Sequence, residues 1–261
     1  MSTDRQAKIQ AASKGTGTGA NAIIVGGIVA IVAVIAVVGA VIWTATRDSG
    51  GTADGGAPAG TEMGQPFNPY PDATLVADAP TVDVYEDFRC PACAVFERTL
   101  GGTINDLAAD GKIKLNVHLK TVIDSNDGKD ASAVAGSSAL CAADQGGWEK
   151  FHEWLFANQP TNHGEFSKDA LRQAAEHAGL TGDKLSAWET CSDDRTYQAY
   201  VTSVDERTAQ DGITGTPVIT VDGTELSWGS FVLDQEGTQA DTEAFAQILA
   251  SGEVPEDRQQ Q

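Results

Sequence analysis

The feature that most restricts the fold of this chain is a pair of cysteines, Cys90 and Cys93, between a strand and a helix. Residues 81–88, TVDVYEDF, nearly alternate β-branched or aromatic side chains with polar ones, which predicts a strand. The sequence AVFERTLGGTINDLAAD after the cysteines predicts a helix, and residues 112–123, KIKLNVHLKTVI, predict a second strand. Strand, helix and strand in this order predict a parallel βαβ unit.

The rest of the folded region continues this α/β pattern around a helical insertion. Residues from about 128 to 210 predict several helices with enough apolar surface for a small core of their own. Strands return at 217–223 and 225–229 as a hairpin, and 241–252 predicts a last helix that begins at the capping residue Asp241. We therefore expect an α/β fold with the order β-α-β, helical insertion, β-β-α.

An uncharged apolar stretch, residues 22–43, lies near the N-terminus. As a helix it would be about 33 Å long, which matches the core of a bilayer. A buried soluble helix would carry polar positions, and a cleaved signal peptide has a shorter apolar region followed by a small-residue cleavage site. We expect a single uncleaved transmembrane helix at Ala22–Trp43, ahead of the folded domain.

Charges around this span predict its orientation. Three cations precede it, and after Arg47 no cation occurs before Arg89, so residues 1–21 are expected in the cytoplasm and the remainder outside. Residues 44–71 are expected to be a flexible linker, since much of that range is rich in Gly and Ala, and 253–261 a C-terminal tail. The net charge of −20 argues against nucleic acid as a partner, because phosphates would be repelled.

The cysteines allow a zinc site, a structural bridge or a redox pair. Zinc would need a second CxxC or paired histidines, but Cys141 and Cys191 are far apart and the histidines show no ligand spacing. We therefore expect no metal. Pro91 suits the first turn of a helix, which places the Cys90 sulfur at the positive helix end and favours its thiolate. A reactive sulfur benefits from this position, whereas a structural bridge does not require it.

A second motif is ITGTPVIT, residues 213–220, in which Pro217 opens a strand after a Gly-Thr turn. Proline at a strand entry is usually an edge or cis-turn feature. CPAC after a strand, a helical insertion and the later Thr-Pro together resemble the DsbA-like branch of the thioredoxin superfamily. More narrowly, they resemble the membrane-tethered, extracytoplasmic DsbA-like proteins of actinobacteria. The resemblance covers about residues 72–252 and implies a thioredoxin fold.

The resemblance implies a role for each motif residue. Cys90 would be the nucleophile and Cys93 its resolving partner. Pro217 would be a cis-proline beside the disulfide, and the backbone of Thr216 would pair with an extended substrate chain. Strong oxidants of the family carry His where this chain has Ala92, so the pair is expected to be less oxidising than in those members.

Other polar and sulfur-containing side chains complete the expected site and fold. Glu86 and Asp87 are alternative proton carriers for the resolving cysteine, as acids near this site are in the family, or else solvated loop acids. Cys141 and Cys191 are expected to form a structural disulfide in an oxidising compartment. A second redox pair or two free thiols are the alternatives.

These observations favour an extracytoplasmic, membrane-anchored oxidase that donates the Cys90–Cys93 disulfide to cysteines of exported proteins. It would need no cofactor of its own. The resemblance implies reoxidation by a quinone-linked membrane partner, DsbB-like or vitamin K epoxide reductase-like. A reductase or isomerase is the first alternative, because isomerase-type relatives also carry Thr before the cis-proline. A redox-inactive peptide-binding or chaperone module is the second. We expect a monomer, since no dimerisation segment is recognisable.

Overall fold

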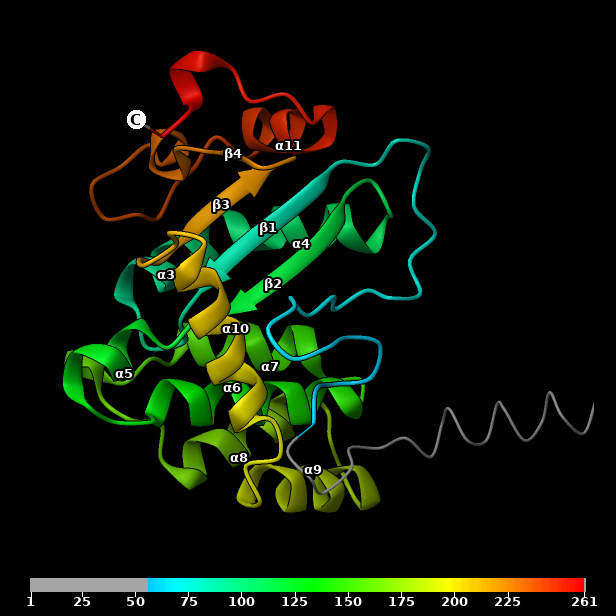
Figure 1. The fold of residues 1–261 in the computed structure, drawn as a ribbon, viewed down its shortest axis with the longest axis vertical. Coiled ribbons are helices and arrows are strands. Elements are labelled where there is room, and N and C mark those ends of the chain that lie inside the picture. Colours follow the sequence, from blue (N-terminus) through cyan, green and yellow to red (C-terminus); the bar gives the residue numbers. More distant parts are fainter. Residues whose placement is uncertain (1–55, 261) are drawn as a thin grey trace, which may run out of the picture. The chain divides into compact units, whose positions relative to one another are not determined.

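The computed structural model describes residues 56–260. In chain order its longer elements are β1 (Thr81–Glu86), α3 (Pro91–Phe96), α4 (Gly102–Ala109), β2 (Lys114–Leu119), α5 (Val122–Asp127), α6 (Ala131–Asp144), α7 (Trp148–Ala157), α8 (Lys168–His177), α9 (Asp183–Asp193), α10 (Gln198–Gln210), β3 (Val218–Val221), β4 (Thr224–Glu225) and α11 (Thr242–Ser251). The order of these elements is the one expected from the sequence (Figure 1).

The expected membrane span, residues 22–43, and the N-terminal segment 1–21 lie outside the described residues. From residue 56 onward, the structure contains no helix whose length and apolar character would allow it to cross a bilayer.

A four-stranded sheet in the order β2-β1-β3-β4 forms the centre of the domain. Strands β1 and β2 are parallel, with Val84 opposite Val117, as the βαβ pattern predicts. Strand β3 returns antiparallel to β1 and places Val218 opposite Tyr85. The short strand β4 completes a hairpin with β3. The predicted second hairpin strand, 225–229, is shorter than expected, because the chain turns into a 3₁₀ helix at Trp228–Phe231.

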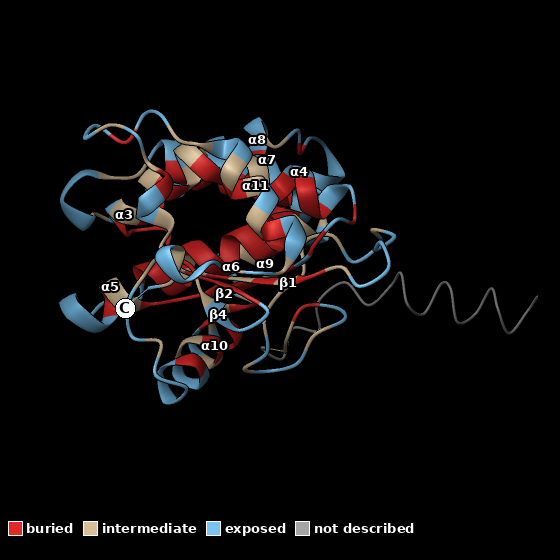
Figure 2. Cartoon of the chain, turned by 90° about the horizontal axis from the view of Figure 1, so that it is seen from above, coloured by how far each residue is buried: buried red, intermediate tan, exposed pale blue. Residues whose placement is uncertain are grey.

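Helices cover both faces of this sheet, with α4 and α11 on one face and α10 on the other (Figures 1 and 2). Alternation along β1 explains the layers, because Val82 and Val84 are buried towards α4 while Asp83 and Tyr85 are only half-buried. The apolar residues Phe96, Leu100 and Ile104 extend the core along the helix that follows the cysteines.

That helix contains a wide turn. Between α3 and α4, residues Glu97–Gly101 form a π-helical segment, and the backbone continues in right-handed helical conformation on both sides. Single π turns inside α-helices often occur at functional sites. Here the wide turn lies directly above the sheet, one turn beyond Cys93.

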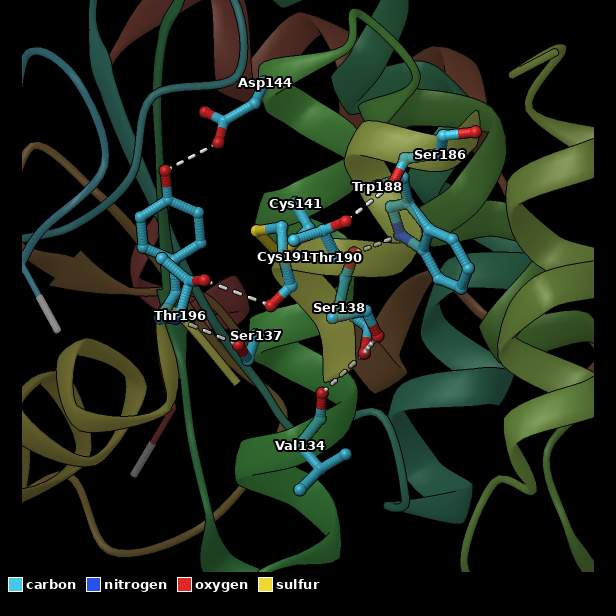
Figure 3. Close-up of a disulfide and its surroundings, with 12 residues drawn as sticks. Val134, Ser137, Ser138, Cys141, Asp144, Ser186, Trp188, Thr190, Cys191 and Thr196 are labelled. Atoms are coloured by element: carbon cyan, nitrogen blue, oxygen red, sulfur yellow. Dashed lines mark hydrogen bonds between the residues drawn. A yellow bond between two sulfur atoms is a disulfide. The ribbon is translucent and has the colours of Figure 1, made fainter. Parts of the chain in front are cut away.

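The helical insertion, α6 to α10, is joined by a disulfide between Cys141 in α6 and Cys191 in α9 (Figure 3). This is the pairing expected from the sequence. Hydrogen bonds reinforce the same contact: the indole of Trp188 donates to the carbonyl of Ser138 at 3.0 Å. Ser137 accepts from the backbone N–H of Tyr197 at 3.0 Å. The insertion therefore has its own covalent and polar connections around its apolar core.

Removing this bridge by the double substitution Cys141→Ser, Cys191→Ser should lower the free energy of unfolding by about 3–4 kcal/mol, because the loop it closes is about 50 residues long. Urea unfolding monitored by circular dichroism measures the change. Reactivity of the Cys90–Cys93 pair in the folded variant should be unchanged, which serves as the control. A variant as stable as the wild type would contradict a stabilising bridge.

Two segments expected to be linker or tail pack on the domain where they are described. Phe67 pairs with Val117 of β2 through two backbone hydrogen bonds of 2.9 and 2.7 Å, and its ring lies 4.8 Å from that of Trp148. The expectation of a flexible linker is therefore wrong for 56–71, the described part of that segment, because it packs against the domain at β2. Near the C-terminus, Arg258 accepts from Ser227 through its carbonyl and stacks its guanidinium on Phe231.

Candidate functional site

The two cysteines lie where β1 passes into α3. Cys90 is the N-cap residue of α3 and Pro91 occupies the first helical position, as expected. Cys90 is 8% exposed and Cys93, one turn later, is 1% exposed. Both thiols are free in the structure. The arrangement presents one sulfur near the surface and keeps the second directly behind it.

The two thiols have opposite acidities. Hydrogen bonding from Cys93 is the main cause that lowers the pKa of Cys90 to about 5; the Thr216 hydroxyl and the N–H groups of Ala92 and Cys93 add to this effect, and burial opposes it. Burial raises the pKa of Cys93 well above its usual value, and the adjacent Cys90 raises it further. At neutral pH, therefore, Cys90 is a thiolate and Cys93 a thiol.

A titration of the reduced protein should show this asymmetry. The ultraviolet absorbance of the thiolate should rise with a midpoint near the Cys90 pKa of about 5. In Cys93→Ala the midpoint should move upward, because the principal hydrogen bond to the thiolate is lost. A midpoint near 8.5, the ordinary thiol value, would contradict the site geometry.

The lowered pKa of Cys90 also makes the free energy of unfolding of the reduced protein depend on pH. Between pH 5 and about 8.5 the unfolded reduced chain binds a proton at Cys90 that the folded chain does not, so the free energy of unfolding rises with pH. This contribution is complete above the unfolded pKa and is lost as the pH falls through 5. The oxidised protein has no thiol to titrate at Cys90 and should lack it, which urea unfolding of both forms would test.

Thr216 and Pro217 lie directly beside the dithiol. The Thr216–Pro217 peptide bond is cis, as expected. The Thr216 carbonyl oxygen lies 3.4 Å from the sulfur of Cys90. Pairing of Val218 with Tyr85 brings this loop to the end of β1, and the preceding residues Thr214 and Gly215 are exposed. An extended peptide reaching Cys90 would therefore meet the Thr216 backbone.

The carboxylates of Asp87 and Glu86, the two candidate proton carriers, have different surroundings. The Asp87 carboxylate accepts hydrogen bonds from the N–H groups of Arg89 and Ile123, at 2.8 and 2.9 Å, and burial raises its pKa to about 6. The backbone of Asp87 is close enough to Cys93 to lower the pKa of its thiol, against the larger effect of burial. Glu86 instead contacts His152 of α7 at 2.6 Å, and burial raises its pKa.

Arg89, which the sequence analysis did not select, anchors the loop that carries Cys90. Its side chain is fully buried and bonds Asp124 at 2.7 Å and Asp127 at 2.5 Å. It also donates to the carbonyls of His163 and Gly164, in the loop that follows α7. Asp124 in turn accepts from the first N–H groups of α6, at 2.8 and 3.0 Å. The guanidinium therefore connects the dithiol loop to the insertion.

Gln159 makes a second connection between the insertion and the dithiol. Its amide donates to the carbonyls of Phe88 and Cys90, at 2.8 and 2.9 Å, on both sides of Arg89. Nothing in the sequence indicates this role, because Gln159 lies far from the cysteines along the chain. Arg89 and Gln159 together fix the backbone on which Cys90 is presented.

Comparison with solved structures finds similar proteins from Mycobacterium tuberculosis. DsbA of Mycobacterium tuberculosis in its oxidised form is 26% identical, with a TM-score of 0.51, and the alignment covers 70% of this chain and 90% of that one. The reduced disulfide oxidoreductase DsbG of the same organism is 24% identical, with a TM-score of 0.54, over 80% of this chain and 94% of that one. At this lower identity, the similarity to DsbG shows a shared fold alone.

Among curated proteins, the serine/threonine-protein kinase PknE of Mycobacterium tuberculosis is 26% identical over 147 residues, which are 53% of this chain. The chain spans only about a quarter of the length of that kinase, 26%. A family model described as thioredoxin matches residues 77–242, from just before β1 to the start of α11. Because this match includes the whole sheet, both cysteines and the helical insertion, and covers more than half of the sequence, the chain belongs to the thioredoxin family.

Proposed function

We propose that the protein is an extracytoplasmic thiol–disulfide oxidoreductase of DsbA type that donates its Cys90–Cys93 disulfide to exported proteins. The observation that carries the proposal is the asymmetry of the dithiol. Cys90, with a pKa of about 5, faces the Thr216 carbonyl, while the pKa of the buried Cys93 is raised. A stable Cys90 thiolate favours the reduced enzyme and so makes its disulfide a good donor.

The reaction consists of two exchanges. A substrate thiolate attacks the sulfur of Cys90 in the disulfide, the Cys90–Cys93 bond breaks, and Cys93 leaves as a thiolate that takes up a proton. A second substrate thiolate then attacks the substrate sulfur of the mixed disulfide and releases Cys90 as a thiolate. The substrate loses two electrons and the enzyme gains them, so no cofactor is needed in the domain.

Asp87 is the better placed of the two candidate proton carriers for Cys93. Its backbone is close enough to Cys93 to lower the pKa of the thiol, and its own pKa of about 6 allows it to give and take a proton near neutral pH. Glu86 is engaged by His152. We therefore assign proton transfer at Cys93 to Asp87, and the extended-substrate contact to Thr216 and Pro217.

The reduced enzyme must return its electrons to an acceptor. We propose a membrane partner of DsbB-like or vitamin K epoxide reductase-like type, and an anchor formed by residues 22–43 that holds the domain close to it. The apolar sequence of residues 22–43 supports a membrane anchor. The cations before it support a cytoplasmic N-terminus with the folded domain on the other side of the membrane. A monomer suffices for the chemistry, since Cys90, Cys93 and Pro217 come from one chain.

The reduction potential of the full chain decides the direction of transfer. Equilibration against glutathione buffers should give a value between about −120 and −180 mV, which supports a disulfide donor. A value near about −230 mV or lower would favour the alternative, a reductase or isomerase that depends on an electron donor at the membrane. Because Ala92 replaces the histidine of the strongest oxidants, we expect a value away from the −120 mV end.

A further inference from the structure

The side-chain amide of Gln159 lies beside the nucleophilic cysteine and is oriented by its own donors. Its Nε2 donates to the carbonyls of Phe88 and Cys90, at 2.8 and 2.9 Å. A carbonyl oxygen can only accept, so the nitrogen of this amide, and not its oxygen, must face the loop. Both N–H groups of the Gln159 side chain are therefore used, and the two contacts fix the direction of its Oε1 atom.

The oxygen of this amide is an unused acceptor. Among residues 56–260 none donates to Oε1 of Gln159, and this atom is not one of the buried polar atoms without a partner. The residue is half-buried, so solvent reaches the oxygen. Because Nε2 and Oε1 diverge from one carbon atom, the oxygen points away from the backbone of the Cys90 loop. The site therefore presents an oriented hydrogen-bond acceptor close to its reactive sulfur.

The loop that begins at Gln159 is held in place by Arg89. The guanidinium donates to the carbonyls of His163 and Gly164. Asn162 and His163 have left-handed backbone angles, with φ of 55° and 56°, which residues other than glycine keep only where the surrounding contacts impose them. Gln159 is therefore fixed before a substrate arrives, and a contact with its oxygen costs little conformational entropy on the side of the protein.

A polypeptide joined to Cys90 would bring its backbone within reach of this acceptor. Oε1 of Gln159 lies within about 10 Å of the Cys90 sulfur, because a hydrogen bond of 2.9 Å and a few covalent bonds separate the two atoms. An extended chain advances about 3.3 Å per residue. A backbone N–H within about three residues of the substrate cysteine can therefore meet this oxygen. The Thr216 backbone approaches the same sulfur from the loop before β3.

We propose that Gln159 Oε1 accepts a hydrogen bond from a backbone N–H of the substrate polypeptide, within about three residues of the cysteine that attacks Cys90. The inference rests on the proposed exchange at Cys90 and adds a contact from the helical insertion to the one assigned to Thr216. A backbone contact is independent of side chains, which suits substrates of different sequence. A substrate residue without an N–H at this position, such as proline, would be disfavoured.

The test compares two thiols that reduce the oxidised full-length protein. One is 2-mercaptoethanol, which has no amide, and the other is an extended peptide with a single cysteine and three residues on either side. In both reactions a thiolate attacks Cys90, a mixed disulfide forms and a second thiolate releases the reduced protein. Acid quenching and mass spectrometry give the rates. The mercaptoethanol rate reports the positioning of Cys90, and the ratio of the peptide rate to it reports substrate contact.

Gln159→Leu should lower this ratio by about three- to tenfold, the effect of losing one hydrogen bond to the bound peptide. A change in the position of Cys90 alone would lower both rates and leave the ratio as it is in the wild type. Asn158→Leu is the matched control, because this neighbouring amide donates within its own helix, to the carbonyl of Trp154 at 2.9 Å. Its ratio should equal that of the wild type.

Peptides that are N-methylated at one residue at a time locate the contact. With the wild type, methylation at one position should lower the ratio as much as Gln159→Leu does, and in that variant the same peptide should show no further loss. Methylation that removes the Thr216 contact should act equally on both proteins. A ratio unchanged by Gln159→Leu, in protein that mercaptoethanol still reduces, would overturn the substrate contact. Wild-type protein that neither thiol reduces would overturn the proposed exchange itself.

Discussion

Replacing Cys90 with serine is expected to reduce the rate of dithiol–disulfide exchange by at least about a thousandfold, because a hydroxyl cannot replace the thiolate that attacks and leaves. The surrounding fold should be unaffected, since serine is nearly isosteric and the site is at the N-cap of α3, where serine is favoured. Oxidation of a reduced, unfolded test protein measures the rate. An exchange rate equal to that of the wild type would contradict both the oxidase and the reductase interpretations.

Cys93→Ser is the informative companion to this variant. When the variant is given a substrate that contains a disulfide, the Cys90 thiolate should attack one of its sulfurs and release the other as a thiolate. With no resolving thiol behind Cys90, this mixed disulfide should persist and be detectable by mass spectrometry without reductant. The double substitution at Cys141 and Cys191 should leave the exchange rate of folded protein near the wild-type value. Wild-type protein without exchange activity, together with peptide binding that is unchanged in all of these variants, would instead support a redox-inactive peptide-binding module.

Arg89→Met should destabilise the domain by about 3–5 kcal/mol, the usual cost of leaving one member of a buried ion pair without its partner. Asp124 would stay buried with only the N–H groups of α6 as partners, and the carbonyls of His163 and Gly164 would lose their donor. Urea unfolding of the oxidised protein measures the loss. We also expect the Cys90 loop to become more accessible to proteolysis.

Arg172 provides the matched control for Arg89. Its guanidinium also contacts two carboxylates, those of Glu176 and Glu189, but it is about half exposed on the surface of α8. Arg172→Met should therefore change the free energy of unfolding by no more than about 1 kcal/mol. Equal losses in the two variants would show that burial of the Arg89 pair is not the source of the effect.

Local sequence signals were sufficient for the elements of the fold and for the dithiol. The alternation in residues 81–88, the proline after Cys90 and the Gly-Thr-Pro turn each have a short-range physical reason, so β1, α3 and the entry to β3 were predictable. The thioredoxin fold with its helical insertion is confirmed by the family match. The expected Cys141–Cys191 pairing is present because α6 and α9 pack together.

Long-range polar contacts could not be predicted in the same way. Arg89 can hydrogen-bond Asp124 and Gly164 only after the insertion packs against the sheet. The same is true of the hydrogen bond from Gln159 to Cys90. The same holds for His152, which showed no ligand spacing along the chain yet lies between Glu86 and Glu97. A buried charge depends on its neighbours in space, and a single sequence contains no local pattern for them.

The strand order has a consequence for how the chain acquires its structure. β1 pairs with β3, so Val82 must meet Val221, and the whole helical insertion is synthesised between them. A contact between residues so far apart in the sequence forms late in folding. The entropic cost of ordering the intervening chain has to be met before the contact contributes any stability. Cys90 and Cys93 are therefore synthesised well before Thr216 and Pro217 can cover them. During that interval the nascent dithiol is unprotected, and the insertion can complete its own Cys141–Cys191 bond before the sheet closes.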